Sequence, residues 1–302
     1  MEKTELQNRF SAEIPQLDMR FWEPMSKHTS FRIGGPVEIM AFPKTPDELA
    51  KILQLSRMLD VKPAILGAGS NILAPDGGMS GIVICLKDAM DRLELLESDR
   101  ILVGAGVTMA RAAVFAANNN LSGLEFAHGI PGTVGGGVYM NAGAYGGDIS
   151  MVCQSVQVMT YDGEILDLTN EQMQFSYRHS RLEEEALIVL SAVFQLSPKP
   201  EAQIREVMQD LMSRRKTSQP LDKPSAGSAF KRPATGYAAA LIDQTGLKGY
   251  RVGDAAVSEK HAGFVVNLGS ATAEDVRNLL SDVAEKVYEA TGVQLEPEVR
   301  IW

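Results

Sequence analysis

The chain has 302 residues, of which 22% are charged and 45% hydrophobic, so it can form one large domain or two to three modest domains with a real core. These fractions are those of an ordinary soluble globular protein and give no sign of disorder. The net charge of −9 argues against non-specific binding to nucleic acid or to an anionic membrane, because either would need a basic face.

Cysteine and histidine usage excludes further classes. Cys85 and Cys153 lie in apolar stretches without CxxC spacing, which predicts two buried, reduced thiols. The four histidines are far apart and form no HExxH pattern, so we expect no metal site. No apolar run approaches the roughly 20 residues of a membrane span. The first residues, MEKTELQNRFSAEI, mix charges where a signal peptide needs an apolar core, so we expect a cytoplasmic protein.

In chain order, strands are expected at residues 37–42 and 63–66, separated by a helix that Thr45 caps and Pro46 opens. A strand from Gly81 completes this first βα unit. Hairpins then follow at 92–107, around Ser98 and Asp99, and at 151–168, with a further strand at 186–196. Between the hairpins, a helix capped by Thr108 runs to residue 118. This middle stretch is typical of a mainly antiparallel α+β structure.

The last hundred residues predict a third unit. A helix starting at Pro200 has one apolar face, formed by Ile204, Val207, Met208, Leu211 and Met212. We then expect a helix near 237–244 closed by Gly246, strands around 252–257 and 264–268, and a helix from the cap Thr272 through 288. The chain should finish in a short strand within EPEVRIW. The fold class predicted for the whole chain is α+β.

Residues 129–147, GIPGTVGGGVYMNAGAYGG, form a glycine-rich segment with eight glycines and no charge. Glycine is costly to order, so such density indicates φ > 0 or a close approach to another group. A flexible linker is the alternative, but linkers mix glycine with serine, whereas Val134, Val138 and Tyr145 are residues that pack. We therefore expect an ordered loop whose N–H groups face a bulky anionic ligand.

A second loop, Gly67–Ala68–Gly69–Ser70–Asn71, follows an expected strand and suits a pyrophosphate. The dinucleotide fingerprint GxGxxG would need a third glycine where Ile72 stands, and it would have to open a helix. Pro75 and the glycines after it prevent that helix. GAGVTM, from Gly104, fails in the same way. No GK[ST] occurs, which argues against a P-loop nucleotidase.

Residues 214–251 contain eight basic and two acidic side chains. This basic stretch has the charge to hold a small polyanion. A solvated surface of the second half of the protein is the alternative interpretation, and charge alone does not separate the two.

Seven motifs together resemble a known family. They are HTSFRIGGP, LGAGSNIL, the glycine-rich segment, YRHS, PSAGSAFKRP, GLKGYRVGDAAVSEKHAGFVVN and EPEVRIW. Their order and spacing, over nearly the whole chain from His28 on, are similar to those of the UDP-N-acetylenolpyruvoylglucosamine reductases (MurB) of bacterial peptidoglycan synthesis. Because no tyrosine occurs between Tyr177 and Tyr237, the chain resembles the shorter subclass, without the tyrosine-loop insertion.

The resemblance implies a two-part FAD-binding domain of the vanillyl-alcohol-oxidase (PCMH) type and a C-terminal α+β substrate domain. We expect FAD-binding subdomains at 1–86 and 87–198 and the substrate domain at 199–302. FAD would be bound noncovalently, with NADPH as co-substrate. The implied reaction reduces UDP-N-acetyl-3-O-(1-carboxyvinyl)-glucosamine to UDP-N-acetylmuramate. The expected partners are these small molecules, with no nucleic acid and no membrane, and the expected state is a monomer.

The resemblance also implies roles for individual residues. Hydride would pass from flavin N5 to C3 of the substrate, Ser228 would protonate C2, and Arg178 and Glu298 would stabilise the enol form. Tyr177, Lys231 and Arg232 would contact the substrate. The expected cofactor contacts are Arg32, Gly67, Gly69, Ser70, Asn71, Gly129, Ile130, Pro131, Gly132, Gly135, Gly136, Asn141, Gly143 and Ala144.

Each assignment has a simpler alternative. By themselves, Arg178 is a surface arginine, Ser228 a turn hydroxyl and Glu298 a solvated carboxylate. Two other functions also stay open: an oxidase of a sugar or alcohol on the same flavin fold, and a flavoprotein that only senses nucleotide sugars. Ser228 and Glu298 argue against the oxidase, which needs a base near its substrate carbon and has no use for a proton donor at C2.

Overall fold

The computed structural model describes residues 4–97 and 99–302. By compactness the chain forms two units, each discontinuous in sequence. Unit 1 comprises Met1–Phe21, Ile39–Ala68 and Gly81–Arg214, and unit 2 comprises Trp22–Glu38, Gly69–Ser80 and Arg215–Trp302. Compactness does not test the three sequential domains with boundaries at residues 86 and 198, which stay a prediction.

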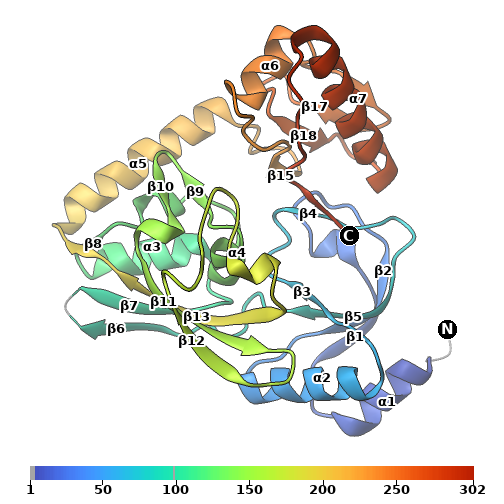
Figure 1. Cartoon of the computed structure of the whole chain (residues 1–302), viewed down its shortest axis with the longest axis vertical. Helices are drawn as coiled ribbons and strands as arrows, with labels where there is room; N and C mark the ends of the chain where they lie inside the picture. Colours follow the sequence, from blue (N-terminus) through green and yellow to red (C-terminus); the bar gives the residue numbers. More distant parts are fainter. Residues whose placement is uncertain (1–3, 98) are drawn as a thin grey trace. The chain divides into compact units, whose positions relative to one another are not determined.

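Unit 1 contains most of two sheets (Figure 1), and the ends of β1, β2 and β5 continue into segments assigned to unit 2. The first has the order β1-β2-β5-β3, and the second is an antiparallel sheet of order β12-β11-β13-β7-β6. Two small two-stranded sheets, β14-β8 and β10-β9, are also present. The strands are β1 (Met19–Pro24), β2 (Pro36–Ala41), β3 (Ala64–Leu66), β5 (Met79–Cys85), β6 (Leu93–Glu97), β7 (Arg100–Gly104), β8 (Leu121–Ser122), β9 (Gly143–Ala144), β10 (Gly147–Asp148), β11 (Cys153–Thr160), β12 (Ile165–Thr169), β13 (Leu187–Gln195) and β14 (Ser197–Pro198).

The helices of this part of the chain are α1 (Glu5–Glu13), α2 (Pro46–Met58), α3 (Met109–Asn118), α4 (Val134–Tyr139) and α5 (Glu201–Ser218), with 3-10 turns η2 (Glu125–Ala127), η3 (Ile149–Met151) and η4 (Arg181–Glu183). Thr45 caps α2 and Thr108 caps α3, as predicted from the sequence. α1, β1 and α4 were not predicted. The expected apolar face of α5 is wrong at Val207, which is 37% exposed, because within α5 only Ile204 and Met208 are buried.

Two apolar cores stabilise unit 1. In one, Leu49, Ile52 and Leu53 of α2 pack with residues of β2 and β5. In the other, the alanines of α3 and the valines of α4 pack with β7, β11 and β13. Small alanine side chains allow α3 to lie close to its neighbours, which explains why its sequence is so rich in them.

Unit 2 holds the sheet β15-β18-β17-β16 and the pair β19-β4. Its elements are η1 (Met25–Lys27), β4 (Ile72–Leu73), β15 (Ser225–Ser228), α6 (Ala238–Gln244), β16 (Arg251–Val252), β17 (Ala255–Val257), β18 (Phe264–Asn267), α7 (Ala273–Thr291) and β19 (Arg300–Ile301). The strand expected at 252–257 is present in part: β17 covers Ala255–Val257, and a turn at Gly253 and Asp254 separates it from β16, which ends at Val252. α7 buries Val276, Leu279, Leu280, Val283 and Val287, which share one helical face.

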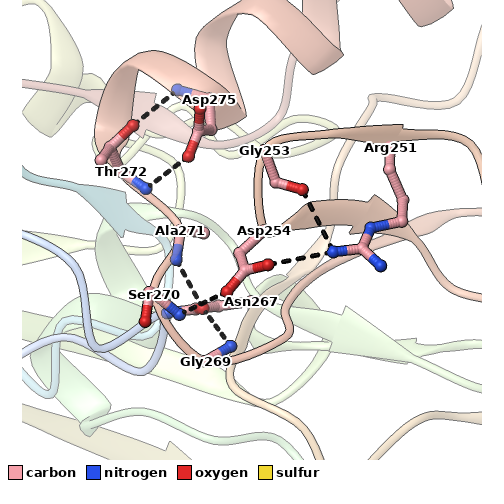
Figure 2. Close-up of polar contacts among 9 residues, drawn as sticks. All are labelled: Arg251, Gly253, Asp254, Asn267, Gly269, Ser270, Ala271, Thr272 and Asp275. Atoms are coloured by element: carbon pink, nitrogen blue, oxygen red, sulfur yellow. Dashed lines mark hydrogen bonds and ion pairs between the residues drawn. The ribbon is translucent and has the colours of Figure 1, made fainter.

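Polar side chains fasten the turn before α7 (Figure 2). Asn267 Oδ1 accepts from the N–H groups of Gly269 at 2.8 Å and Ala271 at 3.0 Å. Asp254 accepts from the N–H of Ser270 and from the guanidinium of Arg251, both at 3.0 Å. The buried Asn267 also donates through Nδ2 to the carbonyl of residue 31 at 3.0 Å, so it joins this turn to the 22–38 segment.

The 69–80 segment is joined to α7 by a carboxylate. Asp76 accepts from the N–H groups of Ala273 at 2.8 Å and Glu274 at 3.2 Å, while Thr272 and Asp275 form a capping box. A negative charge at a helix N-terminus satisfies N–H groups that have no partner within the helix and interacts favourably with the helix dipole. Among the described residues, no helix combines the length and the apolar character that crossing a bilayer would require.

Candidate functional site

The glycine-rich segment is ordered, as expected, but its centre is the helix α4 and not a loop. The hydroxyl of Thr133 caps this helix by accepting from the N–H of Gly136 at 3.4 Å. The N–H groups of Val134 and Gly135 donate to carbonyls between β7 and α3, at 2.8 and 2.9 Å. The protein itself satisfies these donors, so the expectation that they face a ligand is wrong at these positions.

At several glycines of the segment a side chain would have no room, because other parts of the protein pack directly against the main chain. A Cβ on Gly135 would lie 3.0 Å from the Cβ of Ala105, and one on Gly147 would lie 2.7 Å from the ring of Phe126. The density of glycine is therefore explained partly by close packing within unit 1.

Other positions of the segment are available to a ligand. In the described part of the chain, the N–H group of the half-buried Gly132 has no acceptor. Gly136 is exposed, and a Cβ there would meet no atom closer than 3.7 Å. A donor and open surface thus remain on the N-terminal side of α4.

Arg178 contacts this segment across 35 positions of sequence. Its guanidinium donates to the carbonyl of Gly143 at 3.3 Å and lies 5.3 Å from the ring centre of the exposed Tyr177. Arg178 is half-buried, with a φ of +57°. Positive φ is uncommon for a residue with a side chain, and such strain concentrates at functional sites.

Two buried polar side chains fasten the turn that carries Arg178. Asn141 donates to the carbonyl of Ser176 at 3.0 Å and accepts from the N–H of Ser150 at 2.9 Å. Ser180 donates to the carbonyl of Tyr139 at 2.7 Å. The Asn141 amide is thus engaged with the protein on both sides, and the backbone N–H of Asn141 donates to the carbonyl of Val138 at 3.2 Å. Sequence reasoning missed Ser180, although it belongs to the YRHS motif.

The loop after β3 has the donors that a pyrophosphate needs. The N–H groups of residues 67–71 have no acceptor among the described residues. Gly69 has a φ of +60°, and a Cβ on it would lie 2.1 Å from the carbonyl oxygen of His28. A Cβ on Gly67 would lie 2.6 Å from the hydroxyl of Thr133. Successive free N–H groups in such a turn form a concavity that binds anions.

In unit 2 the structure places Glu298, which lies between the bridge at Pro297 and β19, beside the end of β15 that carries Ser228. The N–H of Glu298 donates to the carbonyl of Ala229 at 2.9 Å, and Asn71 donates to the carbonyl of Glu298 at 3.0 Å. Ser228 is exposed and Glu298 is half-buried. β15 has an irregular register before Ser228, at Gly227, whose φ is +80°. Such bulges redirect side chains and are frequent beside active sites.

The basic stretch of residues 214–251 is partly neutralised. Lys248 and Arg251 pair with Asp243 and Asp254, at 2.7 and 3.0 Å. Lys231 contacts Glu296 at 3.5 Å in an exposed pair, which contributes little to stability. The chain therefore offers less free positive charge here than its composition indicates.

Arg232 and Arg32 are both exposed. The guanidinium of Arg232 lies 4.2 Å from the ring centre of Tyr237, which is itself 59% exposed. Arg32 has a φ of +57°. Both cations therefore stand at the surface of unit 2, where a ligand can reach them.

Burial shifts the pKa of several groups. It raises the pKa of Cys153 to about 12 and also raises the pKa of Cys85, which confirms two buried thiols in their protonated form. Burial lowers the pKa of His128, next to Gly129, and the charge of Arg205 lowers it further. In the described residues, His128 Nδ1 is buried without a hydrogen-bond partner.

Comparison with known proteins identifies the family. A model described as "FAD binding domain" matches residues 37–169, and one described as "UDP-N-acetylenolpyruvoylglucosamine reductase, C-terminal domain" matches residues 219–302. The UDP-N-acetylenolpyruvoylglucosamine reductase of Agathobacter rectalis is 47% identical over 96% of this chain and 95% of its own. The chain belongs to the UDP-N-acetylenolpyruvoylglucosamine reductase (MurB) family.

Other members agree with this assignment. The Streptococcus pneumoniae reductase is 43% identical over 94% of each chain. The crystal structure of MurB from Thermus caldophilus matches with a TM-score of 0.80 and 34% identity, over 95% of this chain and 99% of that one. A chitooligosaccharide oxidase, 14% identical with a TM-score of 0.51 over 96% of this chain and 60% of its own, shares the fold alone. The α+β class and the FAD-binding domain predicted from the MurB resemblance are confirmed.

Proposed function

We propose that this protein reduces UDP-N-acetyl-3-O-(1-carboxyvinyl)-glucosamine to UDP-N-acetylmuramate, with bound FAD and with NADPH as the reductant. The observation that carries this proposal is the similarity of nearly the whole chain to reductases of that name, at 47% identity over 96% of its residues. The two family models, for the FAD-binding domain and for the C-terminal domain of these reductases, support it independently.

The residues present fit a noncovalently bound FAD. The free N–H groups of residues 67–71 suit its pyrophosphate, and that of Gly132 suits a polar edge of its ring. A side chain at Gly69 would have no room in that loop. We assign cofactor contacts to Arg32, to residues 67 and 69–71, and to the glycine-rich segment. When bound, FAD supplies the hydride that it takes from NADPH.

Arg178 is proposed to bind the carboxylate of the enolpyruvyl group. As C3 receives the hydride, a second negative charge is shared with that carboxylate, and a fixed guanidinium stabilises this more strongly charged form better than it stabilises the singly charged carboxylate of the ground state. The contact with the carbonyl of Gly143 orients this guanidinium before substrate arrives. Preorganisation of this kind lowers the cost of ordering a long side chain during the reaction.

Ser228 is proposed to give a proton to C2, with Glu298 stabilising the enol form. A positioned proton donor typically contributes about 10²- to 10⁴-fold in rate. Ser228 is exposed on β15, and the main chain of Glu298 is hydrogen-bonded to the residue that follows it. This arrangement supports joint action of the two residues, because each depends on the same strand for its position.

Lys231, Arg232 and Tyr177 are proposed to contact the diphosphate sugar, with no metal ion. Lys and Arg side chains bind phosphate oxygens directly through charge-assisted hydrogen bonds. Because neither NADPH nor a nucleotide sugar crosses a bilayer unaided, we propose that the protein acts in the cytoplasm, where it is expected to be a monomer with small-molecule partners alone.

The test is an anaerobic titration of the purified yellow protein. NADPH should bleach the flavin, and the enolpyruvyl nucleotide sugar should restore its colour while one equivalent of UDP-N-acetylmuramate forms. A protein that NADPH bleaches but that this substrate does not recolour would refute the proposal. A sensor would show no turnover, and an oxidase would be bleached by a sugar or alcohol in the absence of NADPH.

Variants separate the two half-reactions. Ser228→Ala should leave bleaching by NADPH unchanged and slow recolouring by about 10²-fold or more. Ser225→Ala, at the other end of β15, is the matched control, because Ser225 contributes its carbonyl and not its hydroxyl to the hydrogen bond with Ser30. Arg178→Ala should lower turnover while the purified protein keeps its flavin. Equal slowing of both half-reactions in Ser228→Ala would mean that Ser228 is structural.

A further inference from the structure

His261 lies in the turn between β17 and β18 and accepts a hydrogen bond inside that turn. Its ring Nδ1 accepts from the N–H of Gly263 at 3.1 Å. A nitrogen that accepts carries no proton, so the ring is the neutral form with its proton on Nε2. The ring also packs edge-on against Phe264, with 5.0 Å between the ring centres and 73° between the planes. The imidazole is thus held in one orientation by a polar and an aromatic contact.

Gly263 is also hydrogen-bonded through its carbonyl, on the side of Ser228 and Glu298. The carbonyl of Gly263 accepts from the N–H of Ala229 at 2.8 Å, and the carbonyl of Ala229 accepts from the N–H of Glu298 at 2.9 Å. Ser228 is opposite Phe264 in the β15-β18 register. A series of three hydrogen bonds therefore runs from the imidazole, past the peptide after Ser228, to the main chain of Glu298.

On one side, the chain after β15 is held by a bridge between Phe230 and Pro297 and by the N–H of Lys231, which donates to the carbonyl of Glu296 at 2.8 Å. On the other side, the pairing of β15 with β18 is interrupted by the irregular register before Ser228, and Ser225 and Ser228 are the residues paired. A Cβ on Gly263 would lie 3.1 Å from both the imidazole and Ala239, so this peptide fits closely between two side chains. Because the N–H of Ala229 donates to the carbonyl of Gly263, a shift of Gly263 would also move Ala229 and its neighbour Ser228.

We propose that His261 is a positioning residue, whose neutral ring fixes the Gly263 peptide and thereby the main chain of Ser228 and Glu298. This inference rests on the function proposed above for these two residues, and it assigns His261 no contact with substrate. The bond to the N–H of Gly263 orients the residue whose carbonyl Ala229 uses, so its loss loosens the next bond in the series. Burial lowers the pKa of His261, against a smaller opposing effect of a backbone hydrogen bond, which is consistent with a neutral ring.

Three substitutions test the geometry. In His261→Asn, the amide oxygen takes the place of Nδ1 and can accept from the N–H two residues on, as asparagine does in turns. In His261→Gln, the amide reaches the place of Nε2 and misses that N–H, and His261→Ala has no acceptor. The Asn variant should therefore restore what the Gln and Ala variants lose, although Gln resembles histidine more closely in size.

The kinetic measurement follows the two half-reactions separately. We expect His261→Ala and His261→Gln to slow recolouring by substrate roughly 10- to 100-fold, the effect of a small misplacement of reacting groups. Bleaching by NADPH and flavin content should stay within about twofold, and His261→Asn should recover most of the rate. Equal rates in all three variants, or equal slowing of both half-reactions, would overturn the proposal.

Amide hydrogen exchange provides a second measurement that does not depend on activity. The N–H groups of Gly263, Ala229 and Glu298 should exchange faster in the Ala and Gln variants than in the wild type and the Asn variant. If the wild-type protein fails to be recoloured by the substrate, the proposed function fails while the exchange pattern still decides the role of His261. Unchanged exchange at these three amides would overturn that role.

Discussion

The substitution Asn141→Asp separates the two hydrogen bonds that fasten the turn of Arg178. Oδ1 of Asn141 accepts from the N–H of Ser150, and Nδ2 donates to the carbonyl of Ser176. Asparagine 141 is 4% exposed. An aspartate keeps the acceptor but places a second oxygen against the carbonyl of Ser176, where a donor had been.

The cost follows from this geometry. Loss of the donor should lower the free energy of unfolding by about 1–3 kcal/mol at neutral pH, the usual cost of an unsatisfied buried polar group. Burial and the facing carbonyl should raise the pKa of the new carboxyl above its unfolded value of about 3.9. The protonated carboxyl can donate to Ser176, so its stabilising contribution is complete below the unfolded pKa and is lost as the pH rises through the folded pKa.

Asn141→Ala is the matched control, because it loses both hydrogen bonds and cannot titrate. It should cost about 2–6 kcal/mol if both partners stay unsatisfied, at every pH. Urea unfolding of the flavin-free protein, followed by far-UV circular dichroism, measures both variants against wild type. The tryptophans Trp22 and Trp302 both belong to unit 2, so their fluorescence follows the other unit. A cost for Asn141→Asp that does not change between about pH 5 and pH 8 would refute the reasoning.

Three further predictions concern other parts of the fold. Gly67→Ala should destabilise the flavin-free protein by about 1–3 kcal/mol in a thermal unfolding assay and should also weaken flavin binding, because the new Cβ would lie 2.6 Å from the hydroxyl that caps α4. Gly77→Ala is the control and should be neutral in that assay, because its Cβ would have no atom within 4 Å. Asp76→Ala should cost about 0.5–2 kcal/mol through lost capping of α7, seen as an earlier change in tryptophan fluorescence during urea unfolding. Burial lowers the pKa of His128 and of His261. Their contribution to stability is therefore complete above the unfolded histidine pKa of about 6.5 and is lost as the pH falls through the pKa values of the folded protein. Urea unfolding midpoints that stay constant through this pH range would contradict the prediction.

Local signals predicted the helices well. Thr45, Thr108 and Thr272 each cap the helix that the sequence places after them, and Gly292 ends the last helix with a φ of +70°. Capping depends on residues within one turn of each other, so the sequence contains all the information that it needs. The turn between β11 and β12 was predictable for the same reason, whereas the turn expected at Ser98 lies outside the described residues.

Contacts between distant residues could not be predicted in this way. Asp76 bonds to the first turn of α7 almost 200 residues further on, and β19 pairs in parallel with β4. The glycine-rich segment failed for a related reason. Glycine disfavours a helix, but α4 forms because its valines are buried and its first N–H groups find carbonyl partners on another segment. Tertiary packing overrode the local preference.

The residues that hold the proposed site differ in kind from those that would perform the reaction. Arg178 and Ser228 carry recognisable chemistry and belong to motifs, so sequence reasoning could find them. Asn141 acts through the carbonyl of Ser176, two residues before Arg178, and His261 acts through the N–H of Gly263. No sequence motif distinguishes such a role from ordinary packing. In both cases a buried or half-buried side chain fixes the main chain next to the reactive residue. The main chain that carries the reactive residue is therefore positioned by side chains that need not touch substrate themselves.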